Sequence, residues 1–355
     1  MVERHHKKKK YHYLLQQTEL MRKIGITTTV PIEIIYAANA VPVDLNNLFI
    51  THPLPENLIF NAETSGFPRT VCSWIKGLYS IALEKKIKEI IAVMQGDCSN
   101  THALSEIWKE ENFKIIPFSY PYDKNITRLK EEILNLMRYF EISYNDVLKI
   151  KKKLDLIRKK LLFIDNETWQ KNIVSGFENH YFLVTASDFQ SNPEKFEVEI
   201  DKFLIEIKQR SPFNEKIRLG VIGVPPIITD FYQEIEKLEA RVVFNEVQRQ
   251  FAMLTFCKNI EEQYLLYTYP YSVYNRINDI KKEIKKRKID GIIHYVQSFC
   301  FRSIQDKIFR KYIDVPILTL EGDKPENLDQ RNKIRLESFI DMLSIKKSEN
   351  GVAYE

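Results

Sequence analysis

The 355-residue sequence has few cysteines and lacks several compact motifs. Its four cysteines stand far apart, so they do not resemble the dense disulfide framework of small secreted proteins. No CxxC pair, HExxH sequence or compact Cys/His array is present, which argues against zinc-finger and zincin sites. A GxxxxGK[ST] loop is also missing, so the sequence shows no P-loop ATPase of its own.

Long hydrophobic runs and a strong charge imbalance are absent too. No apolar run reaches the roughly 18 residues that span a bilayer. The basic stretch at residues 4–10 is not followed by the apolar core of a signal peptide. We therefore expect a cytoplasmic protein without a membrane partner. The 53 basic and 48 acidic residues leave a net charge of +5, which is too small to indicate a nucleic-acid partner.

The length and the hydrophobic pattern predict two α/β lobes. Single cores rarely grow beyond about 250 to 300 residues, so this chain has room for two. Strand-like runs at Ile90–Met94 and Phe113–Phe118 flank a helical stretch, and a second series ends with Gly291–Val296, Val315–Leu320 and a helix over Asn332–Leu343. Strands that alternate with helices imply parallel sheets. The expected fold is a pair of doubly wound lobes of the Rossmann or flavodoxin-like kind.

A helical segment is expected between the two lobes. From Tyr122 to Gln209 the pattern is charged and helical, with interruptions at Ser143, at a turn over Ile164–Glu167 and at Pro193. No Gly/Ser/Pro-rich linker follows it. We place the boundary at Ser211, so that residues 1–210 form the first lobe with the helical segment and residues 211–355 form the second.

Three cysteines occupy positions where open α/β sheets place their chemistry. Cys72 opens a helical stretch, while Cys98 and Cys300 each follow a strand-like run. They are 26 and 202 residues apart along the chain, so they can meet only if two distant lobes face each other. Three unrelated buried thiols are the alternative. Cys257 lies in a stretch that reads as a helix and is expected to pack as a small hydrophobe.

Several segments resemble the 2-hydroxyacyl-CoA dehydratase component D family, which includes the B and C subunits of benzoyl-CoA reductase and the double-cubane cluster proteins. The resemblance covers residues 22–343 and is carried by TVPIEIIYAANAVPVDL, ETSGFPRTVCSWIKG, GDCSNTHAL, DGIIHYVQSFCFRSIQD and VPILTLEGDKPENLDQRNKIRLESFIDML. It implies a [4Fe-4S] cluster in the cleft between the lobes, with Cys72, Cys98 and Cys300 as its ligands. The chain has too few cysteines for a double cubane.

The resemblance also implies an activity, partners and a substrate class. A cubane usually takes four thiolates, so three would leave one iron with an exchangeable position. In the family, a separate ATP-hydrolysing activator with its own [4Fe-4S] cluster supplies one low-potential electron. An acyl-CoA substrate then loses its hydroxyl group by way of a ketyl radical, which makes the enzyme a lyase of anaerobic metabolism. The working unit is a homodimer or a pair with a related component D subunit.

Two other interpretations remain open at this point. The chain could be a cluster-carrying electron-transfer or structural subunit without its own CoA substrate. A zinc or purely structural protein is a third reading, in which three thiolates and His294 would hold the zinc.

Three residues are candidates for catalysis. Thr29 stands beside Pro31 at an expected helix start, where it could cap the helix or bind substrate. Glu63, with Arg69, flanks the loop that leads to Cys72 and could act as a carboxylate base, although ordinary ion pairing is the alternative. His294 lies on a late strand and could face either the cleft or a core.

Three further residues are candidates for contacts to the cofactor. Ser99 and Asn100 follow Cys98 directly and head a helix, where N–H groups and hydroxyls can hydrogen-bond sulfide or thiolate. Capping of that helix is the simpler alternative. Gln297 stands three residues before Cys300. The segment Glu321–Arg331 could form a cleft wall or a dimer contact.

Overall fold

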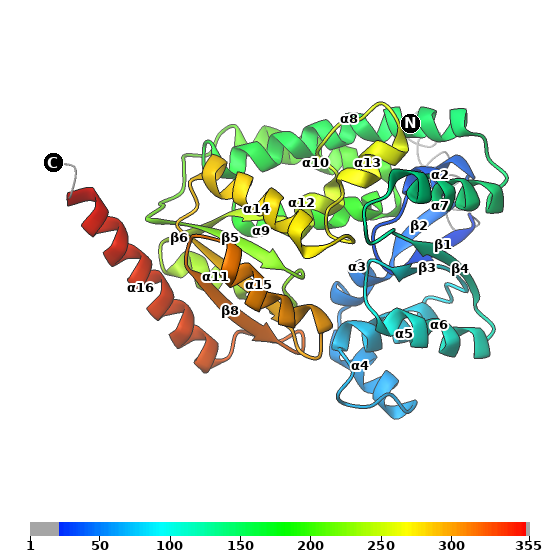
Figure 1. Cartoon of the computed structure of the whole chain (residues 1–355), viewed down its shortest axis with the longest axis horizontal. Helices are drawn as coiled ribbons and strands as arrows, with labels where there is room; N and C mark the ends of the chain where they lie inside the picture. The colour runs from blue at the N-terminus through cyan, green and yellow to red at the C-terminus, as the bar shows by residue number, and fades with distance from the viewer. Residues whose placement is uncertain (1–20, 353–355) are drawn as a thin grey trace, which may run out of the picture.

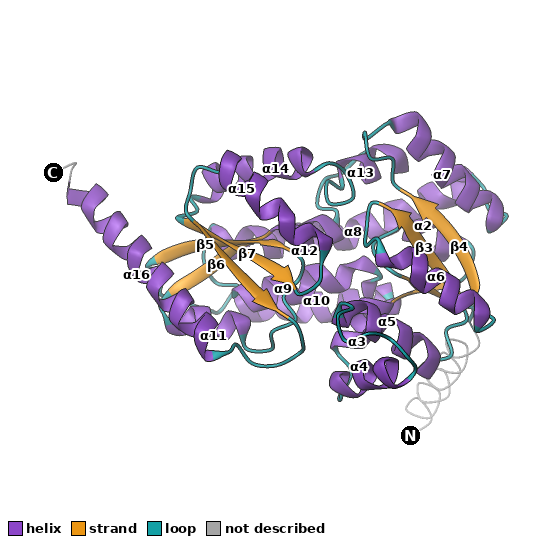
Figure 2. Cartoon of the chain, turned by 60° about the horizontal axis from the view of Figure 1, so that its bottom comes forward, coloured by secondary structure: helices purple, strands orange, loops and turns teal. Residues whose placement is uncertain are grey.

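The computed structural model describes residues 21–352 and contains, in that range, two four-stranded sheets flanked by helices (Figures 1 and 2). The basic segment at residues 4–10 lies outside this range. All strand pairs in both sheets are parallel. The first sheet has the order β2-β1-β3-β4, with β1 (Lys23–Ile26), β2 (Val41–Asp44), β3 (Glu89–Gln95) and β4 (Lys114–Ser119). The second has the order β6-β5-β7-β8, with β5 (Ile217–Gly223), β6 (Ala240–Asn245), β7 (Gly291–Gln297) and β8 (Ile317–Gly322).

Helices connect the strands in both lobes, and the prediction of two doubly wound parallel lobes is confirmed. The first lobe has α2 (Ile32–Ala37), α3 (Leu45–Ile50), α4 (Pro55–Thr64), α5 (Ser73–Glu84), α6 (Asn100–Glu110) and α7 (Ile126–Tyr139). The helical segment has α8 (Tyr144–Trp169), α9 (Gly176–Val184), the 3-10 turns η1 (Thr185–Ser187) and η2 (Phe189–Ser191), and α10 (Pro193–Ile207). The second lobe has α11 (Phe231–Lys237), α12 (Glu246–Ala252), α13 (Ile260–Leu266), α14 (Val273–Arg287), η3 (Phe301–Gln305), α15 (Asp306–Tyr312) and α16 (Gln330–Val352).

Each sheet has a point at which the order of its strands reverses. From β1 the chain moves to the edge strand β2 and then returns to the other side of β1 to form β3. The second lobe repeats this path with β5, β6 and β7. The crevice beyond the carboxyl ends of the strands at such a reversal is where doubly wound sheets bind ligands.

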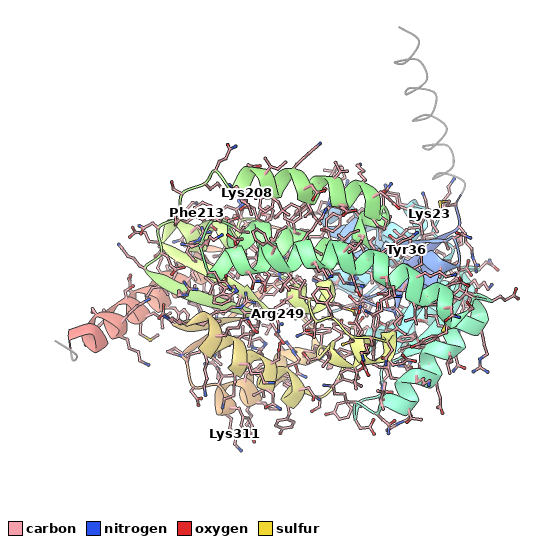
Figure 3. The ribbon with its side chains drawn as sticks, turned by 90° about the horizontal axis from the view of Figure 1, so that it is seen from above. Lys23, Tyr36, Lys208, Phe213, Arg249 and Lys311 are labelled. Carbon is pink, nitrogen blue, oxygen red and sulfur yellow. The ribbon has the colours of Figure 1, made fainter. Side chains whose placement is uncertain are left out.

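The long helix α8 packs against both lobes. It packs against α2 of the first lobe and against β6 of the second, and it runs along both lobes when the molecule is viewed from the side or from above (Figures 1 and 3). Ser143 caps its start by accepting a hydrogen bond from the N–H of Asp146, as the predicted break at Ser143 implied. The predicted turn at Ile164–Glu167 is wrong. The helix continues because Ile164 packs in the core and Asp165 is held by Arg287.

Two other local predictions are also wrong. The helix expected to start beside Pro31 is present as α2, but the sequence also suggested that Pro42 stops it. Instead α2 ends at Ala37, and Pro42 belongs to the edge strand β2, where a missing N–H is tolerated. Cys257 was expected in a helix. Because Met253 takes a left-handed conformation (φ 50°) and ends α12, Cys257 lies in the half-buried segment before α13.

The two lobes share parts of their cores with the helical segment. One core joins the first sheet to α8, α9 and α10, and residues from Val247 to Tyr271 also pack there. The boundary at Ser211 therefore stays a prediction. Within residues 21–352, no helix is long and apolar enough to cross a membrane.

Candidate functional site

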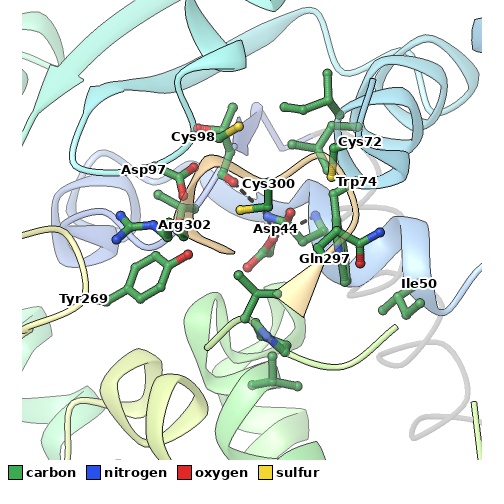
Figure 4. Close-up of a pocket in the computed structure, with 18 of the residues that line it drawn as sticks. Asp44, Ile50, Cys72, Trp74, Asp97, Cys98, Tyr269, Gln297, Cys300 and Arg302 are labelled. Atoms are coloured by element: carbon green, nitrogen blue, oxygen red, sulfur yellow. Dashed lines mark hydrogen bonds between the residues drawn. The ribbon is translucent and has the colours of Figure 1, made fainter. Parts of the chain in front are cut away.

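The two reversal points face each other across a cavity of about 130 Å³ (Figure 4). Its walls include the residues that directly follow the two inner strands of each sheet: Thr27 and Thr28 after β1, Asp97 and Cys98 after β3, Val224 and Pro225 after β5, and Gln297 and Cys300 at and after β7. Both lobes therefore contribute to one site, at the position where each fold is expected to bind a ligand.

The three cysteines predicted to act together all line this cavity. Cys98 and Cys300 come from the loops after β3 and β7, and Cys72 is the N-cap residue of α5. Figure 4 shows the three sulfurs around one space. The structure thus brings together residues up to 228 positions apart in the sequence, as the spacing required.

Each cysteine stands at the start of a helical turn whose N–H groups favour a negative sulfur. The N–H groups of Trp74 and Ile75 lower the pKa of the Cys72 thiol, and those of Asn100 and Arg302 do so for Cys98 and Cys300. Burial is the larger effect in all three. It raises the pKa of Cys72 and of Cys98 to about 12 and raises that of Cys300 as well. A metal or cluster that bound these thiols would therefore have to displace their protons.

The donor set fits an iron-sulfur cluster better than a single ion. Among the residues that the structure describes, no three His, Cys, Asp or Glu side chains converge closely enough to hold one metal ion. The bridging atoms of a cluster separate its ligands by the width of the cluster itself, so wider spacing around a shared cavity suits it. Three thiols are also the ligand type that iron-sulfur clusters take.

His294 and Glu63 lie outside the cavity lining. His294 is buried on β7, where its Nδ1 is 2.7 Å from Oδ1 of Asp306 and its ring packs edge-on against Phe309. Oε1 of Glu63 accepts a hydrogen bond of 2.7 Å from the buried Nζ of Lys76, and Arg69 contributes its carbonyl oxygen to the same lysine. The two side chains thus occupy structural contacts, and their catalytic roles stay predictions.

Thr29 lies just beyond the threonines that reach the cavity. The predicted cap is wrong, because Pro31 occupies the N-cap position of α2 and no side chain caps that helix. The carbonyl of Thr29 accepts a hydrogen bond from the Tyr120 hydroxyl, and its own hydroxyl is buried without a partner among the described residues. Thr27 and Thr28 line the cavity instead.

The three predicted cofactor contacts are placed differently from one another. Ser99 is the N-cap residue of α6 but makes no side-chain capping bond, and Asn100 faces Cys98 through its backbone. Gln297 lines the cavity and is held in place, because its Nε2 donates to the Asp323 carbonyl at 2.7 Å. Their contacts to a cofactor stay predictions.

Arg302 is a site residue that the sequence did not single out. Its Nη2 donates to the Gly96 carbonyl at 3.0 Å, and its guanidinium lies 4.3 Å from the centre of the Tyr269 ring. Burial raises the pKa of Asp97 to about 6, and the positive charge of Arg302 limits that rise. Arg302 therefore ties the Cys300 loop of the second lobe to the Cys98 loop of the first.

A buried pair of acids beneath the cavity was missed as well. Asp44 lines the cavity and accepts hydrogen bonds from the Asn46 N–H at 2.9 Å and from the Ser187 hydroxyl at 2.5 Å. Asp188 in turn accepts from the Asp44 N–H at 2.8 Å. Burial and then the charge of Asp44 raise the pKa of Asp188 to about 7. The two acids stand 144 residues apart, so no local pattern marks them.

Comparison with known protein families gives an independent result. A search of curated proteins found no match. The family model for the 2-hydroxyglutaryl-CoA dehydratase D-component matches residues 27–343, which include the whole cavity and all three of its cysteines. That family implies a component of an activator-dependent 2-hydroxyacyl-CoA dehydratase. The chain therefore belongs to the 2-hydroxyglutaryl-CoA dehydratase D-component family.

Proposed function

We propose that this chain is a [4Fe-4S] subunit of a 2-hydroxyacyl-CoA dehydratase that removes the hydroxyl group from an acyl-CoA by radical chemistry. The observation that carries the proposal is the meeting of Cys72, Cys98 and Cys300 around one cavity at the facing reversal points of both sheets. These three thiols would hold the cluster. When bound, the cluster supplies one low-potential electron and an iron with an exchangeable position.

The positions of His294 and Cys257 support an iron that takes no fourth ligand from either of them. The two other candidates for that position, His294 and Cys257, are not among the described residues that line the cavity. His294 is committed to Asp306, and Cys257 lies near the start of α13 with its carbonyl bound by Lys151. The same placement disfavours a zinc site made of three thiolates and His294.

The chain's own residues hold and shield the reacting groups. Arg302 and Tyr269 both line the cavity, and the contact of the guanidinium with the Tyr269 ring helps to hold Arg302 there. The N–H groups at the starts of α5, α6 and η3 stabilise the three thiolates. The proposal places the protein in the cytoplasm, with an ATP-dependent activator as electron donor and with a second copy or a related component D subunit as its stable partner.

Anaerobic reconstitution tests this proposal. The wild-type chain should bind four iron and four sulfide ions. Cys72→Ser, Cys98→Ser and Cys300→Ser should each lose or convert the cluster, while Cys257→Ser serves as the matched control and should keep it. Wild-type protein without iron would exclude the proposal, and loss confined to Cys257→Ser would show that the ligand set is wrong.

Electron paramagnetic resonance separates the enzyme from an electron relay. An iron without a protein ligand leaves on mild oxidation, so a three-iron signal is expected, and the spectrum should change when acyl-CoA is added. A chain that accepts electrons from the activator but shows neither effect would be a relay subunit.

A further inference from the structure

The segment around Cys300 carries exposed apolar side chains on the surface of the second lobe. Phe299 and Phe301 flank the cysteine directly, and Ile304 follows on η3. All three side chains are exposed, and Ile304 is the most open of them, at 77%. Phe301 also lines the cavity. This side chain therefore connects the space between the three cysteines with the surface of the protein.

Two tyrosines extend the exposed apolar surface over α14 and α15, which lie beside each other (Figure 1). Tyr274 stands at the start of α14 and Tyr312 at the end of α15, and their rings meet edge to face with centroids 5.8 Å apart. The start of α14 also adjoins η3, because Arg276 donates a hydrogen bond to Gln305 at 3.0 Å. We call this set of exposed residues the apolar patch: Tyr274, Phe299, Phe301, Ile304 and Tyr312.

The conformation of Phe299 indicates that the patch does not serve folding. Its φ of 62° lies in the left-handed region, which bulky residues adopt only with strain. The exposed ring offsets that strain with little buried surface. Strained residues of this kind concentrate at functional sites. An exposed apolar patch that contains several aromatic side chains is typical of a protein interaction site.

Positive charge is concentrated in the helices that carry the patch. Together, α14 and residues 301–312 contain ten basic and three acidic residues, a net charge of +7. The whole chain has a net charge of only +5, so the remaining residues are slightly acidic as a group. The basic character of the protein therefore belongs in large part to this one region.

Much of that charge is available to a partner. All three acids of these helices are already held in ion pairs, Asp279 with Arg249, Glu283 with Arg287 and Asp306 with Arg310. Four exposed lysines make no ion pair with an acid in the described part of the chain: Lys282, Lys285, Lys307 and Lys311. A partner that carries acidic groups around an apolar centre would match this surface in both respects.

We propose, on the basis of the proposed function, that the apolar patch and the lysines of α14 and α15 form the docking face for a protein electron donor with an acidic surface. Phe301 belongs to both the patch and the cavity lining, so a donor seated on the patch lies next to the proposed cluster. Electron-transfer encounters use small, short-lived interfaces, and opposite charges accelerate their formation.

Stopped-flow reduction of the full-length, anaerobically reconstituted protein tests the inference. The probe is a reduced plant-type [2Fe-2S] ferredoxin, which is an acidic protein donor. We expect its second-order rate constant to fall at least about tenfold between about 0.01 M and about 1 M salt, because salt screens the attraction. Reduced methyl viologen is the control donor. It is a small cation that needs no docking face, so its rate should not fall with salt.

The outcomes of this experiment separate the inference from the proposed function. A cluster that methyl viologen reduces but ferredoxin does not would overturn the inference and leave the proposed function standing. Reduction by ferredoxin at a rate independent of salt would do the same. Protein that assembles no cluster, or a cluster that neither donor reduces, would overturn the proposed function and the inference with it.

A pair of double variants makes the test specific to the face. Ile304→Glu combined with Lys307→Glu should slow reduction by ferredoxin at least about tenfold at low salt and leave the methyl viologen rate unchanged. Lys202→Glu combined with Ile205→Glu makes the same changes three residues apart on the exposed face of α10 and should leave both rates unchanged. Thermal melting of both variants identifies a loss of fold.

Two results with a folded Ile304→Glu/Lys307→Glu protein would contradict the inference. The first is a ferredoxin rate equal to that of the wild type. The second is an unchanged ferredoxin rate together with the loss of binding to phosphatidylserine vesicles that the wild type shows in a sedimentation assay. That second result would assign the face to an acidic membrane surface instead of a protein donor.

Discussion

The two lobes share one framework but divide the site unequally. Both sheets have the same strand order, and both cysteine loops read Gln-x-x-Cys, from Gln95 to Cys98 and from Gln297 to Cys300. The helix before each of these loops also begins in the same way. Cys72 and Ser272 are the N-cap residues of α5 and α14, with φ of −51° and −55° and ψ of 135° and 143°.

The difference lies in which atoms the shared positions carry. Cys72 precedes its loop cysteine by 26 residues and Ser272 precedes Cys300 by 28, yet the first lobe offers a thiol there and the second a hydroxyl. The strand ends differ in the same way, because β2 ends with Asp44 and β6 with Asn245. Asp44 faces the cavity, while the Asn245 amide donates to Asn179 and Gly176. The repeated fold thus supplies equivalent backbone positions in both lobes, but at these two positions only the first lobe carries a thiol and an acid that line the cavity.

Exchanging the two helix-start residues is the largest test of this comparison. Cys72→Ser should remove or convert the cluster, and Cys72→Ser combined with Ser272→Cys should not restore it. The reason is that Ser272 is not among the described residues that line the cavity. Iron and sulfide content provide the measurement, with Ser272→Cys alone as the control that keeps its cluster. Full restoration would mean that the lobes are interchangeable.

Replacing a glycine by alanine should destabilise the protein by different amounts in the two strand-end loops. Gly223 and Gly96 have φ of 104° and 102°, which alanine adopts with strain. An added Cβ would lie 2.0 Å from the carbonyl oxygen of Tyr295 at Gly223, but 2.8 Å from the Pro270 side chain at Gly96. We expect Gly223→Ala to lower the free energy of unfolding by about 4 kcal/mol and Gly96→Ala by about 3 kcal/mol. Chemical denaturation measures both, and a costlier Gly96→Ala would contradict the ranking.

The acidic pair should make the first lobe sensitive to pH. An unfolded aspartate has a pKa of about 3.9, whereas that of folded Asp188 is about 7. Between these values the folded state binds more protons, so stability falls as the pH rises, by up to about 1.4 kcal/mol per pH unit. Asp188→Asn should flatten this fall in melting temperature between pH 5 and 7.5. The exposed Asp314→Asn should retain it, and equal slopes in all three proteins would argue against the raised pKa.

The smallest effect is expected at Phe299, which occupies the place that Asp97 has in the other loop. Phe299 takes a left-handed conformation (φ 62°) with 54% of its surface exposed. Phe299→Gly should relieve that strain and raise the free energy of unfolding by about 0.5 to 1 kcal/mol, after the entropic cost of glycine. Phe299→Ala keeps the strain and loses the ring, so it should bring no such gain.

The features that could be predicted from the sequence are those that local residue patterns determine. Cys98 and Cys300 follow strands, and strand ends in doubly wound sheets converge, so the cavity could be anticipated from three loops and a family resemblance. The end of α12 could not, because no local signal marks the left-handed conformation of Met253, which packs in the core shared with the first sheet. The segment Ile164–Glu167, with three polar residues, likewise reads as a turn. Its helical structure could be anticipated only if the long-range ion pair of Asp165 with Arg287 were known.

The site residues that the sequence analysis missed share one property. The role of each depends on a contact with a residue far away in the sequence. Arg302 is one of many basic residues until Gly96, 206 positions earlier, accepts its hydrogen bond. Asp44 is an ordinary helix cap until Asp188 comes to lie beneath it. The charge balance of the cavity is thus a property of the folded chain alone.

The separation of 202 residues between Cys98 and Cys300 also determines how long after Cys98 the third cysteine is synthesised. At about 5 to 20 residues per second, a ribosome needs roughly 10 to 40 s to reach the third cysteine after it has made the second. During that interval Cys72 and Cys98 exist on a nascent first lobe without the β7 loop that completes their cavity. For the proposed ligands, the complete cluster site therefore exists only after Cys300 has been synthesised, and Cys72 and Cys98 must stay reduced and unligated until then.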